Sequence, residues 1–124
     1  ANKVNLEMPK YVADRLTREL GGDLKGKRIQ IAGISYKPGV SDLRESPALI
    51  LINELRNMGA EVIWHDPLVK EWSNEKSTDL DKEIDLGIIV TPHSEIDFTP
   101  WLEGNVKVVD VSATSQEYGW TKYL

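Results

Sequence analysis

The feature that most constrains the fold is a strand–helix–strand unit in the first half of the chain. An apolar strand pattern at residues 28–32 leads through residues 33–47 into a helical apolar pattern that begins at Ala48. A second strand pattern follows at residues 61–65. A repeat of about 30 residues between strands implies a right-handed crossover that joins parallel neighbours in one sheet.

Two more strand patterns extend this unit. Residues 86–90 are apolar throughout, which is typical of a parallel strand buried on both faces, and residues 106–111 form the fourth pattern. The sequence therefore predicts an α/β fold, a doubly wound, mostly parallel Rossmann-like sheet. We expect four or five strands, numbered along the chain, in the order 3-2-1-4 or close to it.

An amphipathic helix is expected before the first strand. Apolar residues recur every four positions from Met8 to Leu20, and Gly21-Gly22 ends the pattern. Such a helix needs a surface to pack on. It either lies on the sheet or forms the end of a longer helix from a preceding domain.

Composition excludes several classes of protein. The 124 residues suffice for one domain with its own core. The net charge of −5, from 15 basic and 20 acidic residues, is mild, and the sequence contains no basic stripe that would suggest nucleic-acid binding. No apolar run approaches the roughly 20 residues of a membrane span. The absence of cysteine removes disulfides, thiolate metal sites and a cysteine nucleophile, and the two histidines cannot build a metal site unaided. We expect a cytoplasmic protein that binds neither metal, membrane nor nucleic acid.

The connection between the first strand and the helix carries the most informative residues. It is about twice as long as the 2–6 residues usual for such a connection, which suggests a working loop. Ser46 and Pro47 at its end are typical of a helix start, with the serine as cap and the proline at the first helical position.

Lys37 and Arg44 lie in this loop, and helix capping does not explain the presence of two positively charged residues there. A helix N-terminus favours anions, so two cations beside it suit a phosphate or pyrophosphate. The alternative is that both cations pair with Asp42 and Glu45 on a solvated loop. The local sequence leaves these two interpretations open.

Other polar residues at strand ends point to binding without catalysis. Only Gly33 of a G-x-G-x-x-G pattern is present, so phosphate contacts would have to come from side chains. Asp66 fits either a turn or a ribose contact, His93 a helix start or a ligand contact, and His65 a structural role. No Ser-His-Asp set or metal-ligand cluster stands out.

Several segments together resemble one family. They are residues 33–38 (Gly-Ile-Ser-Tyr-Lys-Pro), 42–48 (Asp-Leu-Arg-Glu-Ser-Pro-Ala), 59–62, 66–67 and 91–95. The chain resembles the C-terminal nucleotide-binding domain of the UDP-glucose/GDP-mannose dehydrogenase family. That family oxidises the C6 alcohol of a nucleotide-sugar to a carboxylate in two NAD-dependent hydride transfers.

The resemblance implies roles for the loop residues. Tyr36 and Lys37 would contact the nucleotide of the UDP-sugar, and Arg44 would reach the pyrophosphate of NAD held mainly by a domain absent from this chain. Asp42 and Glu45 would orient the cations, and Ser46 would cap the helix.

The resemblance also implies how the chain is organised. Residues 1–25 would end the family's central helical segment, and residues 26–124 would form the nucleotide-sugar-binding domain. The isolated fragment would be catalytically silent. The full-length enzyme would contain NAD-binding and central domains and form a homo-oligomer.

One departure and two alternatives stand beside this resemblance. The family usually carries an arginine after the fourth strand, whereas this chain reads Asp-Val-Ser-Ala at 110–113, so we expect weak binding by the fragment alone. The Tyr-Lys-Pro variant looks more like the UDP-linked N-acetylhexosamine branch. The alternatives are a stand-alone nucleotide-binding or assembly module without enzyme activity and a receiver-type signalling domain, the latter disfavoured because no acidic pair follows the first strand.

Overall fold

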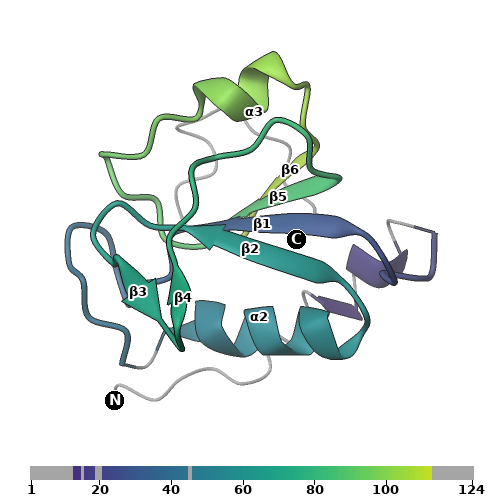
Figure 1. Ribbon diagram of the computed structural model, residues 1–124, viewed down its shortest axis with the longest axis horizontal. Helices are drawn as coiled ribbons and strands as arrows, with labels where there is room; N and C mark the ends of the chain where they lie inside the picture. The colour runs from purple at the N-terminus through teal and green to yellow at the C-terminus, as the bar shows by residue number, and fades with distance from the viewer. Residues whose placement is uncertain (1–12, 15, 19–20, 45, 113–124) are drawn as a thin grey trace.

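The computed structural model describes residues 13–14, 16–18, 21–44 and 46–112, and they form an α/β domain built on a parallel sheet (Figure 1). The four strands of this sheet are β1 (Arg28–Ala32), β2 (Glu61–His65), β5 (Leu86–Ile89) and β6 (Val108–Asp110). A small antiparallel hairpin consists of β3 (Glu71–Trp72) and β4 (Glu75–Lys76), and the two helices are α2 (Pro47–Asn57) and α3 (Thr99–Glu103). The predicted fold class is confirmed.

The strand order is β2-β1-β5-β6, so the expected order, which would have placed β2 between β5 and β1, is wrong. The burial of the strands gives the physical reason. Strand β2 alternates between buried and more exposed residues, as an edge strand does, whereas β5 is buried along its whole length. Since β5 needs neighbours and helices around it, it lies inside the sheet, between β1 and β6.

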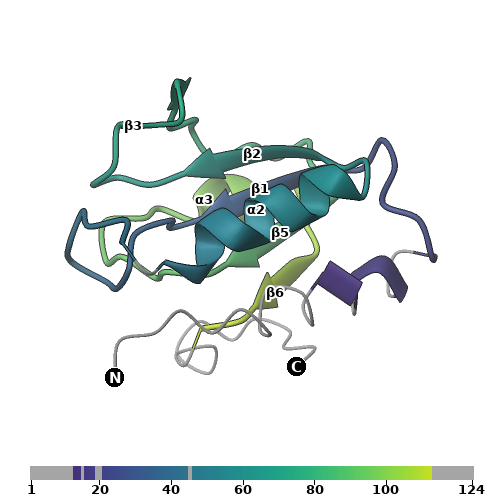
Figure 2. The same ribbon diagram turned by 90° about the horizontal axis from the view of Figure 1, so that it is seen from below.

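The two faces of the sheet are covered separately. Helix α2 packs on one face with the larger apolar core, and α3 lies on the opposite face with a smaller core that includes Trp101 (Figures 1 and 2). The indole of Trp101 lies against the backbone of β5 at Gly87, where an added Cβ would come within 2.8 Å of the ring. Glycine in this strand therefore makes room for the helix.

Helix α2 begins and ends as its sequence predicts. The Ser46 hydroxyl accepts a hydrogen bond from the backbone N–H of Ala48 at 3.2 Å, and Pro47 occupies the first turn. Gly59 follows the C-cap with φ of +91°, the left-handed conformation that ends many helices. The apolar face of α2, including Leu51 and Leu55, is fully buried.

The connection from β2 to β5 contains a hairpin. Residues 71–76 form the β3–β4 hairpin, which turns at two residues with positive φ, Ser73 and Asn74. Arg56 of α2 anchors the hairpin by donating two hydrogen bonds of 2.7 Å to the carboxylate of Glu75. The guanidinium lowers the pKa of the Glu75 carboxyl and the carboxylate raises that of Arg56. A contact of this kind between distant segments is not visible in local sequence.

The segment after β5 is a turn. Of the two roles weighed for His93, the helix start is not observed, because residues 91–95 form a turn and the helix α3 starts only at Thr99. Among the described residues, no helix is long and apolar enough to cross a membrane.

The described residues before β1 are partly helical. Residues 13–14 and 16–18 are in helical conformation, and Ala13 and Leu16 are buried in the same core as α2. The helix ends where the glycines predicted it, because the backbone N–H of Gly22 bonds the carbonyl of Thr17 at 2.7 Å. The expected start at residues 8–9 lies outside the described residues.

Candidate functional site

The strand order places a topological switch point between β1 and β5. The chain passes from β1 to β2 on one side of the sheet and later reaches β5 on the other side, and ligands of doubly wound sheets bind at such a point. The two strand ends meet closely there: a Cβ added to Gly33 would lie 1.8 Å from the carbonyl oxygen of Thr91. Gly33 also has φ of +81°, so both space and conformation require glycine at this position.

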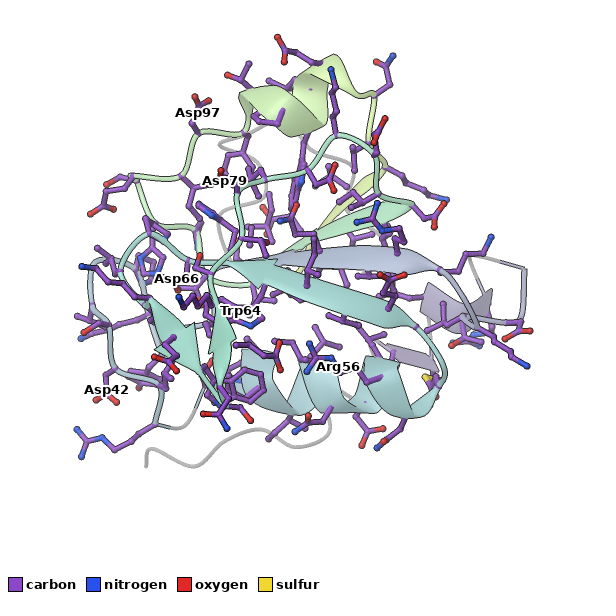
Figure 3. All side chains as sticks on the ribbon, in the orientation of Figure 1. Asp42, Arg56, Trp64, Asp66, Asp79 and Asp97 are labelled. Carbon is purple, nitrogen blue, oxygen red and sulfur yellow. The ribbon has the colours of Figure 1, made fainter. Side chains whose placement is uncertain are left out.

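A buried carboxylate organises the backbone at this point. Asp66, directly after β2, is 2% exposed, and Figure 3 shows it near the ends of the strands. Its oxygens accept hydrogen bonds of 2.8–3.2 Å from the backbone N–H groups of Ile34, Ser35, Leu68 and Val69 and from the ring of His93. Because protein donors surround both oxygens, Asp66 fixes the loop, and the alternative role as a ribose contact is not supported.

His93 joins the same cluster from the turn after β5. Its side chain is fully buried, and Nε2 lies 3.0 Å from Oδ2 of Asp66 and 2.9 Å from Oγ of Ser35. Its Nδ1 accepts a hydrogen bond from the backbone N–H of Gly39 at 3.0 Å. His93 therefore contacts the loop after β1 through hydrogen bonds, and it does not lie at the start of a helix.

The outer part of the loop presents the predicted binding residues to solvent. The backbone N–H of Tyr36 donates to the carbonyl oxygen of Asp42 at 2.6 Å, which brings the two halves of the loop together. The Tyr36 side chain is exposed, and so is Lys37, whose ammonium group has no hydrogen-bond or ion-pair partner among the described residues.

Arg44 and Asp42 form an ion pair at the edge of this loop. The Arg44 guanidinium donates from Nε and Nη2 to both Asp42 oxygens at 2.8–3.2 Å, and its side chain is 88% exposed. Hydrogen bonds from Arg44 lower the pKa of Asp42 to about 2. The pairing proposed for a solvated loop is thus present for Arg44, while Lys37 is left out of it.

The base of the loop is closed by Ser46. Besides capping α2, its hydroxyl donates a hydrogen bond of 2.6 Å to the carbonyl of Ile34. This bond joins the two ends of the loop at its base, next to the backbone that Asp66 holds. Glu45, which was expected to orient the cations, lies outside the described residues.

A separate cleft of about 390 Å³ opens at the carboxyl edge on the α3 side. Its lining residues are His65, Pro67, Asp79, Leu80, Glu95, Asp97 and Pro100. Three carboxylates make this cleft a poor place for phosphate, and the described residues contain no group of three side chains able to hold a metal ion. The ring of His65 bonds the carbonyl of Thr78 at 2.7 Å, as expected of a structural histidine.

The end of β6, where the family usually has an arginine, carries a buried acid. Asp110 is fully buried, and its Oδ1 accepts hydrogen bonds from the backbone and hydroxyl of Ser112. Its Oδ2 has no hydrogen-bond partner among the described residues. The described part of this strand end therefore offers no cation to a nucleotide.

The sequence singled out the exposed residues of the loop and undervalued the buried ones. Asp66 and His93 were weighed as turn, helix-start or ligand residues, and Ser35 and Thr91 were given no role in the site; the Thr91 hydroxyl donates to the carbonyl of Ser35 at 2.7 Å. One signal was available. Asp66 and His93 each follow a strand end closely, and parallel strands bring such positions to one edge of the sheet.

Comparison with known proteins agrees with the geometry. Residues 30–116 match the model of the "UDP-glucose/GDP-mannose dehydrogenase family, UDP binding domain". A UDP-glucose 6-dehydrogenase from Rickettsia conorii is 33% identical over 112 residues, which cover 82% of this chain and 26% of the relative. A UDP-N-acetyl-D-mannosamine dehydrogenase from Methanococcus aeolicus is 36% identical over 98 residues, 77% of this chain and 22% of the relative.

Solved structures give the same picture. The UDP-N-acetyl-mannosamine dehydrogenase Cap5O from Staphylococcus aureus superposes with a TM-score of 0.71 at 28% identity, covering 88% of this chain and 27% of that one. The chain thus spans about a quarter of the length of the relatives it matches.

Proposed function

We propose a function from the family to which this chain belongs: it is a member of the UDP-glucose/GDP-mannose dehydrogenase family and corresponds to that family's UDP-binding domain. In the proposal, the loop after β1 binds the nucleotide of a UDP-sugar within an NAD-dependent UDP-sugar 6-dehydrogenase. The 124 residues would supply one half of the active site and contain no cysteine to serve as its nucleophile. Alone they would be catalytically silent.

The observation that carries this proposal is the state of Lys37. Its ammonium group is exposed, has no partner among the described residues, and lies on a loop whose base is fixed at the switch point of the sheet. A lysine in this setting suits a phosphate, because the ion pair with the ligand displaces no existing one. The exposed ring of Tyr36 beside it offers a flat surface for the base or ribose.

The backbone supports a site built from side chains. In a glycine-rich phosphate loop, free backbone N–H groups bind the anion. Here the N–H groups of Ile34 and Ser35 already donate to the carboxylate of Asp66. A phosphate at this loop therefore depends on Lys37, which agrees with the absence of the second glycine.

The remaining parts of the proposal concern the whole enzyme. Arg44, exposed at the outer edge of the loop, would turn toward the pyrophosphate of NAD bound by another domain, with Asp42 as its resting partner. The NAD-binding and central domains, a homo-oligomer and a cytoplasmic location complete the proposal. The relatives include UDP-glucose and UDP-N-acetyl-D-mannosamine dehydrogenases, so both sugars are candidates for the substrate.

A titration with UDP tests the proposal directly. We expect the backbone amide signals of Tyr36, Lys37 and Gly39 to shift in ¹H–¹⁵N spectra of the 124-residue chain at millimolar UDP. Uridine at equal concentration is the control, because the phosphate contact should make UDP the stronger ligand. Unmoved loop signals at millimolar UDP would contradict the assignment of the site.

Replacing Lys37 by alanine should weaken UDP binding about tenfold, the effect of losing a charge-assisted hydrogen bond worth ~1.5 kcal/mol. The matched control is Lys82→Ala, an exposed lysine that precedes β5 at the other end of the strands. Isothermal titration calorimetry, with NMR line shapes where affinity is low, measures both variants. Equal affinities of Lys37→Ala and Lys82→Ala for UDP would remove Lys37 from the site.

A further inference from the structure

His93 is buried, yet its ring reaches into the loop that presents Lys37. The imidazole comes from the turn after β5, on the other side of the switch point. Its two nitrogens contact two different parts of the loop, Ser35 through Nε2 and Gly39 through Nδ1. The ring therefore spans the segment that contains Lys37.

These hydrogen bonds define the tautomer of the ring. A backbone N–H can only donate, so Nδ1, which lies 3.0 Å from the nitrogen of Gly39, must accept and carries no proton. The proton of the neutral ring is then on Nε2, which faces the carboxylate of Asp66 and the hydroxyl of Ser35. Asp66 thus orients the ring, and the ring in turn offers a defined acceptor to the loop.

Both flanks of Lys37 depend on this ring. On one side, the Ser35 hydroxyl that contacts Nε2 donates to the carbonyl oxygen of Lys37 at 3.1 Å. On the other side, the amide of Gly39, two residues further on, donates to Nδ1. Gly39 has φ of +83° and open space around its Cα, so it permits the turn, and the ring holds it in place.

We propose that His93 is a positioning residue for nucleotide binding, which fixes the turn at residues 35–39 so that Lys37 meets the phosphate without prior ordering. The inference rests on the proposed function, because it assigns His93 to that same site. A turn released from the ring would sample other conformations in the free protein. The entropy of ordering it would then oppose binding.

Two substitutions separate the two arms of the ring. Glutamine can place its amide N–H₂ near the position of Nε2 and keep the contact with Asp66, while the acceptor for Gly39 is lost. Asparagine can place its amide oxygen near the position of Nδ1 and keep the bond from Gly39, while the contact with Asp66 is lost. The control is His65→Gln, the same change in a histidine whose ring bonds the carbonyl of Thr78, while only its backbone carbonyl contacts the loop, at Gly33.

The first measurement needs no ligand. We expect the Gly39 amide to exchange its hydrogen about tenfold faster in His93→Gln than in the parent chain, with His93→Asn closer to the parent. In the parent itself, ¹H–¹⁵N correlations of the ring should show Nδ1 unprotonated and Nε2 protonated. Unchanged Gly39 exchange in His93→Gln, or a proton on Nδ1, would overturn the inference.

The second measurement uses UDP. His93→Gln should bind UDP about 5- to 30-fold more weakly, the effect expected when one more backbone residue has to be ordered on binding. His65→Gln should match the parent, and thermal unfolding of the three chains separates an effect on affinity from one on stability. Equal UDP affinities of His93→Gln and His65→Gln would overturn the role in binding. If the parent chain fails to bind UDP, the proposed function fails, while Gly39 exchange still decides whether His93 holds the turn.

Discussion

Asp66→Asn is the substitution that most directly tests how the loop after β1 is held. The change keeps the size of the side chain and removes one acceptor oxygen and the negative charge. In the parent, Oδ2 accepts from Ile34, Ser35 and His93, and Oδ1 accepts from Leu68 and Val69. An asparagine has one acceptor oxygen, so its NH₂ group must face the donors on one of the two sides.

The structure sets the size of the effect. The less costly orientation keeps the three donors on the loop side and leaves the two N–H groups of Leu68 and Val69 without an acceptor. An unsatisfied buried donor costs about 1–3 kcal/mol, and the half-buried position of Leu68 reduces its share. We therefore expect a loss of about 3 kcal/mol, a large part of the roughly 5–15 kcal/mol that stabilises a domain.

Urea unfolding followed by tryptophan fluorescence measures this loss, because Trp64 and Trp101 are buried in the two cores. With an m-value of about 1.5 kcal/mol/M, the midpoint should fall by about 2 M. The control is Asp97→Asn. Asp97 is exposed and, within the described part of the chain, accepts hydrogen bonds from the nearby Thr99 alone; asparagine can accept them as well, so the midpoint should move little. A fall of less than about 0.5 M in Asp66→Asn, corresponding to under 1 kcal/mol, would refute the role of the carboxylate as the anchor of the loop.

Two further outcomes are expected. Gly33→Ala should prevent stable folding or lower the free energy of unfolding by about 3 kcal/mol or more, because its Cβ would clash with the Thr91 carbonyl and φ is positive. Gly39→Ala, where the space is open, should lower it by only about 1 kcal/mol. Similar urea midpoints for the two variants would contradict this. Arg44→Gln should raise the pKa of Asp42 from about 2 toward its ordinary value of 3.8, read from the carboxyl ¹³C shift. Since the folded-state pKa is depressed, the ion pair contributes to folding stability above pH 3.8, and this contribution is lost as pH falls toward 2. An unchanged titration midpoint of Asp42 in Arg44→Gln would show that the guanidinium is not the cause of the low pKa.

Local sequence was enough to predict the elements with strong periodicity or capping. The helix from Pro47 begins at a Ser-Pro pair and ends before a glycine, and the strands are marked by short apolar runs. The strand order was predicted wrongly even though the pattern carried the answer. The polar residues at both ends of 61–65 mark an edge strand, while the apolar run at 86–90 requires an interior one.

The parts of the site that depend on long-range hydrogen bonds could not be predicted. Asp66 and Ile34 are 32 residues apart, and His93 and Ser35 are 58 apart. Nothing near Asp66 in the sequence distinguishes a buried anchor from an ordinary turn aspartate followed by proline. By contrast, Lys37 stood out in the loop sequence as a cation that capping does not require, while the role of Tyr36 followed from the family resemblance; both side chains are exposed, and their contact with a nucleotide stays a prediction.

The anchor also explains why one glycine suffices in this loop. In a glycine-rich phosphate loop the backbone after the first strand stays open to the ligand's anion. In this chain the carboxylate of Asp66 takes the place of the ligand's anion, because it accepts hydrogen bonds from the backbone N–H groups of Ile34 and Ser35. An internal anion there rigidifies the loop and repels a phosphate at the same place, so a phosphate bound by this loop would have to lie farther out, as proposed for Lys37. Adding glycines to the loop would therefore leave the proposed phosphate site where it is; moving that site inward would require removing the carboxylate of Asp66 and replacing the five hydrogen bonds that it accepts.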